Sequence, residues 1–288
     1  MKYITIADLS QTIRQNLWKI PHDIDAVIGV PRSGMIAASV ISSYLNVPLI
    51  DIDSYVTGRR PSGGSRLRYF EESHKSTGKM LVVDDTVWQG FAMQTVRERL
   101  KNFKGDYIYT CVYLEGKGEK SVDIWLEDLR PFTNNFTQIV LYEWNIFQHH
   151  AKFMSHCLYD IDGVMCVEPP DERDEEKYLE YIRNAKPLFI PRTPIGGIIT
   201  YRLSENRKIT EQWLKEQGVQ CSNIYMFPAH TWQERKDTGV SSATFKGRFY
   251  KERDEFKLFV ESDAMIAIRI AAIANKPVFC IETNMIYQ

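Results

Sequence analysis

The sequence has little that would point to a membrane, to nucleic acid or to a disulfide framework. None of its apolar runs approaches the roughly eighteen residues that a membrane span requires. Its 36 lysines and arginines are offset by 37 acids, so the formal net charge of -1 provides no basic field for nucleic acid. The five cysteines lie far apart and form no CxxC pair. We therefore expect a soluble, cytoplasmic protein with free thiols, no membrane span and no nucleic-acid partner.

What the chain does have is enough residues for two domains. At about 150 residues per domain, 288 residues suffice for two, and 44% apolar residues can give each its own core. Strand and helix patterns alternate in both halves, which predicts the α/β class with two doubly wound, mostly parallel, Rossmann-like sheets. The aromatic and histidine-rich segment 143–156 is typical of a packed connector. We predict domains 1–152 and 153–288.

The expected elements follow from apolar runs for strands and from helical spacing for helices. In the first half, strands are expected over 26–30, 47–52, 80–83 and 106–115, and helices over 35–47 and 91–103. In the second half, strands are expected over 157–161, 195–200, 222–227, 257–261 and 277–281, and helices over 171–184, 205–217, 246–254 and 263–274.

Two acids mark a candidate site in the first half. The segment LVVDDTVWQG places Asp84 and Asp85 at the end of a strand, before a loop with Gly90 and a helix start. Ligands of open α/β sheets bind at that edge, because helix N-termini there present unpaired N–H groups to anions. The pattern indicates a phosphate in the loop and a hydroxylated sugar on the acids. A helix N-cap or a solvated turn stays an alternative.

The same segment resembles the signature of type I phosphoribosyltransferases, of the orotate phosphoribosyltransferase-like kind, which bind phosphoribosyl pyrophosphate (PRPP). The resemblance implies that Asp84 and Asp85 bind the ribose hydroxyls and that the loop holds the 5-phosphate, mainly through backbone N–H groups. The loop residues implied are Thr86, Val87, Trp88, Gln89, Gly90, Phe91, Ala92 and Met93. Trp88 and Gln89 stand where many members have small hydroxyl residues, which favours a non-standard acceptor.

Two more segments match that family. VIGVPRSGMIAA resembles its pyrophosphate loop, which implies Arg32, Ser33 and Gly34 at the leaving pyrophosphate. The long segment 57–79 stands where the family has a hood that closes over the site and excludes water. Its candidate pyrophosphate contacts are Arg59, Arg60, Arg66, Arg68 and Lys75. A solvated surface loop is the alternative for any one of these side chains.

A second acid pair opens the other half. CLYDIDGV sets Asp160 and Asp162 two residues apart at a strand end, where one carboxylate can attack phosphorus and the other can act as general acid. Taken alone, the pair also fits a calcium-loop fragment or a surface turn. The arrangement resembles motif one of haloacid-dehalogenase (HAD)-type enzymes. This implies Asp160 as the nucleophile that forms an aspartyl-phosphate and Asp162 as the acid/base.

Later segments resemble the rest of a HAD-type site. GGIIT is expected to end a strand on Thr200, the hydroxyl that would bind the transferring phosphoryl group. Lys246, expected near a helix start, is preferred over Lys251 as the lysine that balances phosphoryl charge. FVESD matches the acidic metal motif. The resemblance therefore implies Mg²⁺ held by Asp160, Asp162, Glu261 and Asp263, in a site with little or no cap.

Together these features predict a bifunctional enzyme. The first half would transfer 5-phosphoribosyl from PRPP to a nucleobase, a small metabolite or a glycan hydroxyl, with release of pyrophosphate. The second would remove the 5-phosphate from the phosphorylated ribosyl product. The alternative is a HAD phosphatase regulated by a non-catalytic domain that senses PRPP or a nucleotide. The identity of the acceptor and formation of a homodimer stay open.

Overall fold

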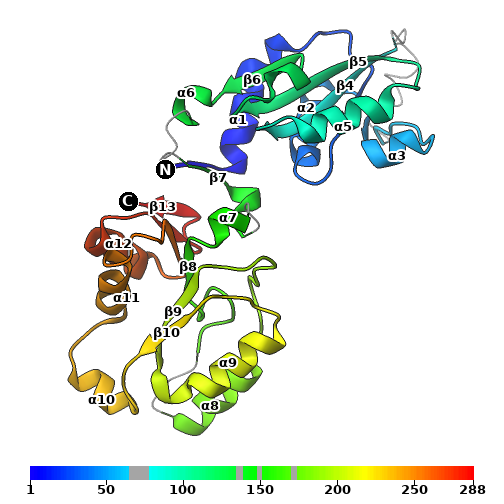
Figure 1. Ribbon diagram of the computed structural model, residues 1–288. Helices are drawn as coiled ribbons and strands as arrows, with labels where there is room; N and C mark the ends of the chain where they lie inside the picture. Colours follow the sequence, from blue (N-terminus) through cyan, green and yellow to red (C-terminus); the bar gives the residue numbers. More distant parts are fainter. Residues whose placement is uncertain (65–77, 134–138, 148–150, 170–173) are drawn as a thin grey trace. The chain divides into compact units, whose positions relative to one another are not determined.

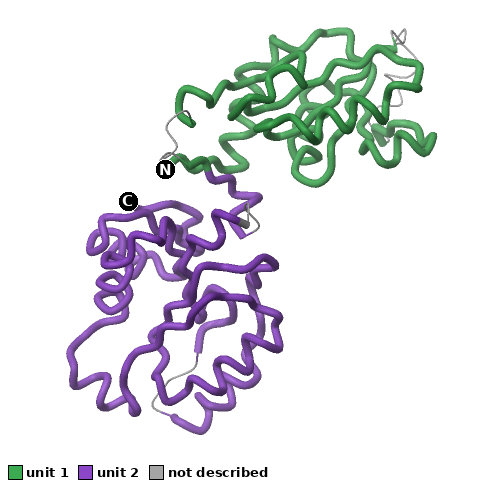
Figure 2. Tube along the Cα trace, viewed as in Figure 1, with its two compact units in different colours: residues 1–140 green, residues 141–288 purple. Residues whose placement is uncertain are grey.

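The chain folds into two compact units, residues 1–140 and 141–288 (Figure 2). The structure is a computed structural model, and it describes residues 1–64, 78–133, 139–147, 151–169 and 174–288. The division lies after Val140, whereas the sequence predicted a boundary near residue 152. The difference has a packing reason: Phe147, in the expected connector, stacks on Phe189 with ring centroids 4.7 Å apart, so this segment belongs to the second unit.

The first unit is built on a five-stranded parallel sheet of order β3-β2-β4-β5-β6 (Figure 1). Its elements are β1 (Lys2–Ile4), α1 (Ile6–Asn16), β2 (Ala26–Gly29), α2 (Gly34–Leu45), β3 (Leu49–Asp51), α3 (Ile52–Val56), β4 (Lys79–Val87), α5 (Phe91–Leu100), β5 (Asp106–Leu114), β6 (Ile124–Asp128) and α6 (Arg130–Thr133). A two-stranded sheet pairs β1 with β7 (Val140–Tyr142). The central strand β4 is apolar from Met80 to Val83 because both of its faces are covered, as in most parallel sheets.

The second unit is built on a six-stranded sheet of order β10-β9-β8-β11-β12-β13. Its elements are α7 (Ala151–Met154), β8 (Cys157–Tyr159), α8 (Glu175–Asn184), β9 (Gly197–Leu203), α9 (Arg207–Glu216), β10 (Ile224–Phe227), α10 (Trp232–Asp237), α11 (Ser242–Lys251), β11 (Leu258–Glu261), α12 (Ala264–Ala274), β12 (Val278–Cys280) and β13 (Met285–Tyr287). Five strands run parallel, and β13 is antiparallel to β12. The predicted α/β class with mostly parallel sheets is thus confirmed.

Among the element ends that differ from the prediction, three bear on the sites. Strand β4 does not stop before the acids but continues through Asp84 and Asp85 to Val87. Strand β9 continues past Thr200 to Leu203, so Thr200 lies inside the strand. Helix α11 begins at Ser242, because the Ser241 side chain accepts a hydrogen bond from the Thr244 N–H and caps the helix.

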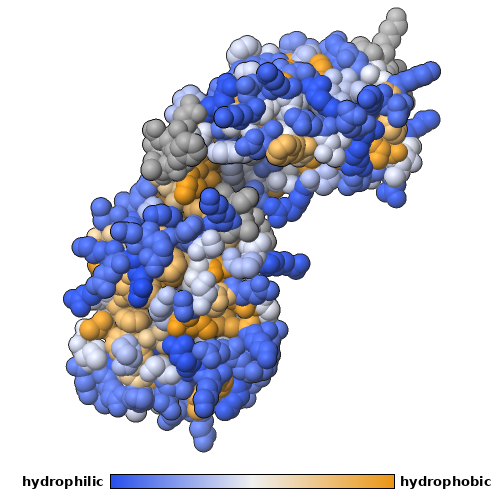
Figure 3. Space-filling view, in the orientation of Figure 1, coloured by the Kyte–Doolittle hydropathy of each residue, from blue (hydrophilic) through white to orange (hydrophobic). Residues whose placement is uncertain are grey.

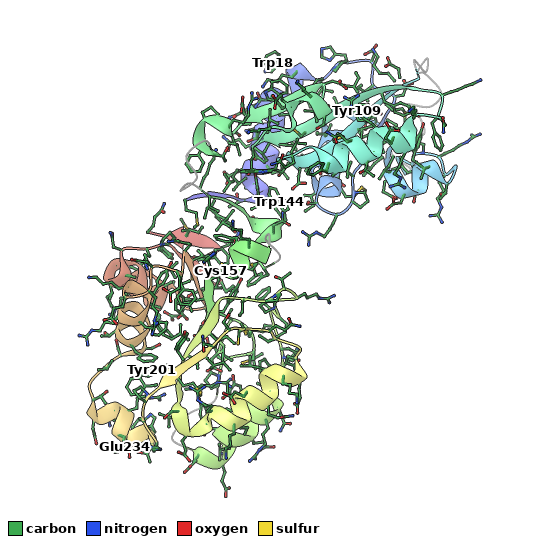
Figure 4. The ribbon with its side chains drawn as sticks, in the orientation of Figure 1. Trp18, Tyr109, Trp144, Cys157, Tyr201 and Glu234 are labelled. Carbon is green, nitrogen blue, oxygen red and sulfur yellow. The ribbon has the colours of Figure 1, made fainter. Side chains whose placement is uncertain are left out.

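The exterior of the visible face is largely hydrophilic, with apolar side chains gathered in smaller areas of each unit (Figure 3). Among the described residues, the apolar helices α2 and α12 have only 12 and 11 residues, and no helix could cross a membrane. The core of the second unit packs α11 and α12 against β8, β11 and β12. Figure 4 labels Cys157, which begins β8, and Tyr201 of the neighbouring strand β9.

Candidate active sites

The paired acids of the first unit are buried at the carboxyl end of its central strand. Asp84 and Asp85 are 7% and 4% exposed. The Asp84 Oδ1 accepts the Asp85 N–H at 2.9 Å, and Thr86 Oγ1 donates to Asp85 Oδ2 at 3.3 Å. Burial, and then the charge of Asp85, raises the pKa of Asp84 well above its ordinary value. Within the described residues no lysine or arginine pairs with Asp84, so ligand hydroxyls are suitable donors to it.

The predicted pyrophosphate loop lies directly beside these acids. A Cβ on Gly34 would stand 2.8 Å from Asp84 Oδ1 and 3.0 Å from the Val83 carbonyl oxygen, so only glycine fits this approach. Arg32 and Ser33 precede it, Arg32 being exposed and Ser33 partly exposed. The fold therefore brings Arg32, Ser33 and Gly34 to the same strand end as Asp84.

The predicted phosphate loop follows β4 and leads into α5. Gly90 has a φ of 81°, and a Cβ there would meet Ser121 Oγ at 2.5 Å. The first hydrogen bond inside the helix joins the Gln94 N–H to the Gly90 carbonyl at 2.9 Å. The N–H groups of residues 91–93 therefore have no acceptor within the helix, which is the arrangement that receives an anion.

The side chains of this loop divide into two sets. Val87 and Met93 are 3% and 0% exposed and pack in the core of the first unit, so only their backbone groups can reach a ligand. Trp88 and Phe91 are 50% and 71% exposed. Two exposed aromatic rings therefore stand at the loop, and Trp88 is one of the two residues at positions where the resemblance leads one to expect small hydroxyl residues.

Only part of the predicted hood can be placed. Arg59 and Arg60 are exposed and follow α3. Arg66, Arg68 and Lys75 lie outside the described residues. Their role stays a prediction.

In the second unit, one lysine lies between two buried carboxylates. Lys246 Nζ donates to Asp160 Oδ2 at 2.6 Å and to Glu261 Oε2 at 2.8 Å. The side chains of Lys246, Asp160 and Glu261 are 3%, 6% and 1% exposed. Although burial disfavours its charge, the two carboxylates raise the pKa of Lys246. The structure thus brings Lys246 to Asp160, from the middle of α11, while Lys251 is exposed at the end of that helix.

Asp160 keeps one oxygen available. Its Oδ1 is buried and accepts no hydrogen bond from the described residues. Burial, together with the charges of Glu261 and Asp162, raises the pKa of Asp160 despite the opposing effect of Lys246. Thr200 is fully buried in the adjacent strand β9, and its Oγ1 accepts the Arg202 N–H at 3.3 Å. The Oδ1 atom of Asp160, which has no partner among the described residues, is therefore placed to contact a ligand.

Asp162 is held by an arginine that sequence reasoning missed. Arg202 Nη2 and Nε donate to Asp162 Oδ1 and Oδ2 at 2.6 and 3.0 Å, and the Tyr181 hydroxyl donates to Oδ1 at 2.7 Å. Burial would raise the pKa of Asp162, but these donors outweigh it and lower that pKa. A signal existed for Arg202: it follows Thr200 by two residues, so it shares one face of the strand. For Tyr181 we find no signal in the sequence.

The predicted magnesium ligands are not gathered into one cluster. Among the described residues, no three histidine, cysteine, aspartate or glutamate side chains converge as a metal site. Asp263 Oδ1 instead accepts the Ile266 N–H at 2.7 Å and caps α12. A cation still fits beside Asp160, because two carboxylates share one lysine and Oδ1 has no partner in the described chain. The set of four stays a prediction.

The family model described as "Phosphoribosyl transferase domain" matches residues 2–145. The xanthine-guanine phosphoribosyltransferase of Idiomarina loihiensis is 28% identical over 129 residues, which cover 44% of this chain and 74% of that protein.

Solved structures of the same kind are also similar. The purine phosphoribosyltransferase of Pyrococcus horikoshii has 19% identity and a TM-score of 0.35, over 49% of this chain and 92% of that one. The Helicobacter pylori xanthine-guanine-hypoxanthine phosphoribosyltransferase has 14% identity and a TM-score of 0.35, over 50% and 94%.

Proposed function

We propose, from the premise that the chain belongs to the phosphoribosyl transferase domain family through residues 2–145, that it is a bifunctional enzyme. The first unit transfers 5-phosphoribosyl from PRPP to an acceptor. The second removes the 5-phosphate from the product through an aspartyl-phosphate.

For the transfer, the first unit provides three supports at one strand end. Asp84 and Asp85 accept hydrogen bonds from the ribose hydroxyls, residues 91–93 offer N–H groups to the 5-phosphate, and the loop at Gly34 borders the pyrophosphate. The bond between C1 of the ribose and the pyrophosphate oxygen breaks, and its electron pair leaves with the pyrophosphate. The acceptor forms the new bond to C1 and loses its proton. The buried carboxylates stabilise the positive charge that develops on the ring.

For the hydrolysis, the observation that carries the proposal is Asp160. It is a buried carboxylate with one oxygen held by Lys246 and the other without a partner among the described residues. That oxygen attacks phosphorus, the bond from phosphorus to the 5-oxygen breaks, and the 5-oxygen takes a proton from Asp162. Water then attacks the aspartyl-phosphate, releases phosphate and returns a proton to Asp162.

The charges around these groups set what each role requires. Arg202 stabilises the ionised form of Asp162, so Asp162 must take up a proton from solvent before it can protonate the 5-oxygen, and it returns to the ionised form afterwards. Lys246 neutralises charge at Asp160. Bound Mg²⁺ beside Asp160 would neutralise phosphoryl oxygens, and Asp160 with Glu261 would hold it.

The test is an incubation with PRPP and magnesium, with and without pooled acceptors, followed by phosphorus NMR. We expect acceptor-dependent pyrophosphate release by the wild type, and a 5-phosphorylated product that accumulates only in Asp160→Asn. An Asp84→Asn, Asp85→Asn double variant is expected to lose pyrophosphate release while it still hydrolyses the isolated product. Release of pyrophosphate at the normal rate by that double variant would contradict the transferase assignment. Ligand binding without any pyrophosphate release would favour a PRPP or nucleotide sensor.

A further inference from the structure

A cavity of about 420 Å³ lies in the second unit, beyond the ends of β9 and β10, where α8, α9 and α10 begin. Figure 1 labels these three helices. Its volume is within the range of small-molecule sites. The side chains that matter here are Tyr178, Glu205, Asn206, His230 and Trp232. The roles proposed above for the second unit use none of them.

The cavity lies at the same edge of the sheet as the acids, the edge formed by the carboxyl ends of β8 and β9. Tyr159 is in register with Ile198, so Asp160 is level with Ile199. Leu203, which lines the cavity, comes four residues later in β9, roughly 13 Å along the strand at about 3.3 Å per residue. The cavity therefore lies beyond Asp160 in the direction in which β9 runs.

A chain of contacts joins the two places. The Tyr181 hydroxyl donates to Asp162 Oδ1 at 2.7 Å. The Tyr181 ring stacks on Tyr178 with centroids 6.0 Å apart, and Tyr178 lines the cavity. Tyr181 is therefore the single residue between Asp162 and the cavity-lining Tyr178 in this chain of contacts.

The lining suits a flat ring with polar edges. Trp232, which is partly buried, and Tyr178 provide aromatic surface. The half-buried Asn206 amide, which makes no side-chain hydrogen bond to the described residues, offers both a donor and an acceptor. His230 Nδ1 lies 2.9 Å from Glu205 Oε2, which leaves Nε2 for a ligand. Lys236 Nζ lies 4.9 Å from the centroid of the Trp232 ring, and a heterocycle can stack on the same ring. Ring nitrogens and carbonyls match the polar groups beside it.

One wall of the cavity is rigid. Arg235 Nη1 donates to the Tyr201 carbonyl at 2.6 Å, and the guanidinium lies 4.2 Å from the centroid of the Tyr201 ring. Thr231 and Glu234 form a capping box at the start of α10, and Figure 4 labels Tyr201 and Glu234. Trp232 is the first residue of that helix, so the cap fixes its backbone.

We infer that this cavity binds the heterocyclic base of a ribonucleoside 5-monophosphate whose phosphate lies at Asp160. The inference rests on the proposed function of the second unit, and it narrows the substrate to a nitrogen heterocycle joined to ribose. It also narrows the acceptor of the first unit to the same class, in place of a glycan hydroxyl.

The experiment compares adenosine, guanosine, cytidine and uridine 5-monophosphates with ribose 5-phosphate, on the full chain with magnesium. Hydrolysis rates are measured for the wild type, Trp232→Ala and Asn206→Ala. Trp18→Ala and Asn184→Ala serve as matched controls, since both replaced residues lie outside the cavity lining. Binding of each nucleotide to the same set in an Asp160→Asn background is measured by saturation-transfer NMR.

We expect at least one nucleotide to exceed ribose 5-phosphate in kcat/KM. Trp232→Ala should raise KM for that nucleotide by roughly tenfold, as loss of one base-stacking contact does, and leave ribose 5-phosphate within about twofold. Equal losses for both substrates, or no loss of nucleotide binding in either variant, would overturn the inference. If the wild type hydrolyses nothing but binds nucleotides in a Trp232-dependent way, the cavity assignment stands and the phosphatase assignment fails.

Discussion

The two units treat their buried carboxylates differently. Asp84 in the first unit is 7% exposed, and no cation among the described residues pairs with it. In the second unit, Lys246 lies between Asp160 and Glu261, and Arg202 binds Asp162 through two nitrogens. An isolated buried charge is unfavourable, so the first site gains from a ligand that donates hydrogen bonds. In the second, two basic side chains face three carboxylates, which leaves negative charge for a bound cation. The contrast supports sugar hydroxyls at the first and a phosphoryl group with a cation at the second.

The largest expected effect is from Lys246→Met. This change leaves Asp160 and Glu261 buried without their shared cation, and we expect a loss of about 3–5 kcal/mol in the free energy of unfolding. Urea unfolding at pH 7 measures it. Lys251→Met, on the exposed end of the same helix, is the control and should stay within about 0.5 kcal/mol of the wild type. A variant as stable as that control would remove the contrast between the two units.

The second largest effect is expected when the arginine that binds Asp162 is removed. Arg202→Met should cost about 3 kcal/mol, and adding Asp162→Asn should recover much of the loss, because the unpaired charge is then gone. The pKa of Asp162 is lowered in the folded state, so its contribution is full above the ordinary aspartate pKa and is lost as the pH falls through the lower folded value. The gap between wild type and Arg202→Met should therefore narrow in acid. Unfolding of the wild type, the two single variants and the double variant is measured at two pH values. Strictly additive losses of stability in the double variant would contradict the prediction.

Arg202 also shows which part of the fold could not be predicted from the sequence, namely the end of β9. The parallel strands could be predicted, because strands covered on both faces are short apolar runs such as AVIG and LVV. The end of β9 could not, since the sequence TYRL carries no turn residue and the apolar run predicts a strand that ends at Thr200. With the strand expected to end there, the two-residue spacing between Thr200 and Arg202 could not be recognised as one face of a strand.

Among the site residues, too, some could be predicted from the local sequence and others could not. Asp84, Asp85, Asp160 and Asp162 were found because acids following an apolar strand stand out locally. The partners of the acids come from remote segments: Tyr181 lies 19 residues from Asp162, and Lys246 lies 86 residues from Asp160. Lys246 was preferred because a helix start was expected near it, whereas the Ser241 cap sets that start earlier and α11 carries the lysine inward. Tertiary packing decides such contacts.

A smaller effect is expected at the first site from Gly34→Ala. The new Cβ would stand 2.8 Å from Asp84 Oδ1 and 3.0 Å from the Val83 carbonyl oxygen, so the loop must move away from β4. We expect a loss of about 1–3 kcal/mol in stability, and PRPP binding weakened by roughly tenfold in calorimetric titration. Ser43→Ala, at an exposed position of α2 outside the loop, is the control. Unchanged PRPP affinity would separate this loop from the ligand.

The smallest expected effect is a gain in the free energy of unfolding, from Asp84→Asn. Burial and Asp85 raise the pKa of Asp84 in the folded protein, so the folded state loses stability as the pH rises from the ordinary aspartate pKa towards the raised one. Asp84→Asn keeps an oxygen for the Asp85 N–H but removes the charge, and should raise the free energy of unfolding at pH 7 by about 1 kcal/mol, or Tm by about 2–4 °C. The gain should vanish near pH 4, where the aspartate is already protonated. Asp106→Asn, at an exposed position at the start of β5, should change Tm little at either pH. Thermal melts of the three proteins decide it: if Asp84→Asn is less stable at pH 7, a cation must balance Asp84 after all, and the difference between the two units disappears.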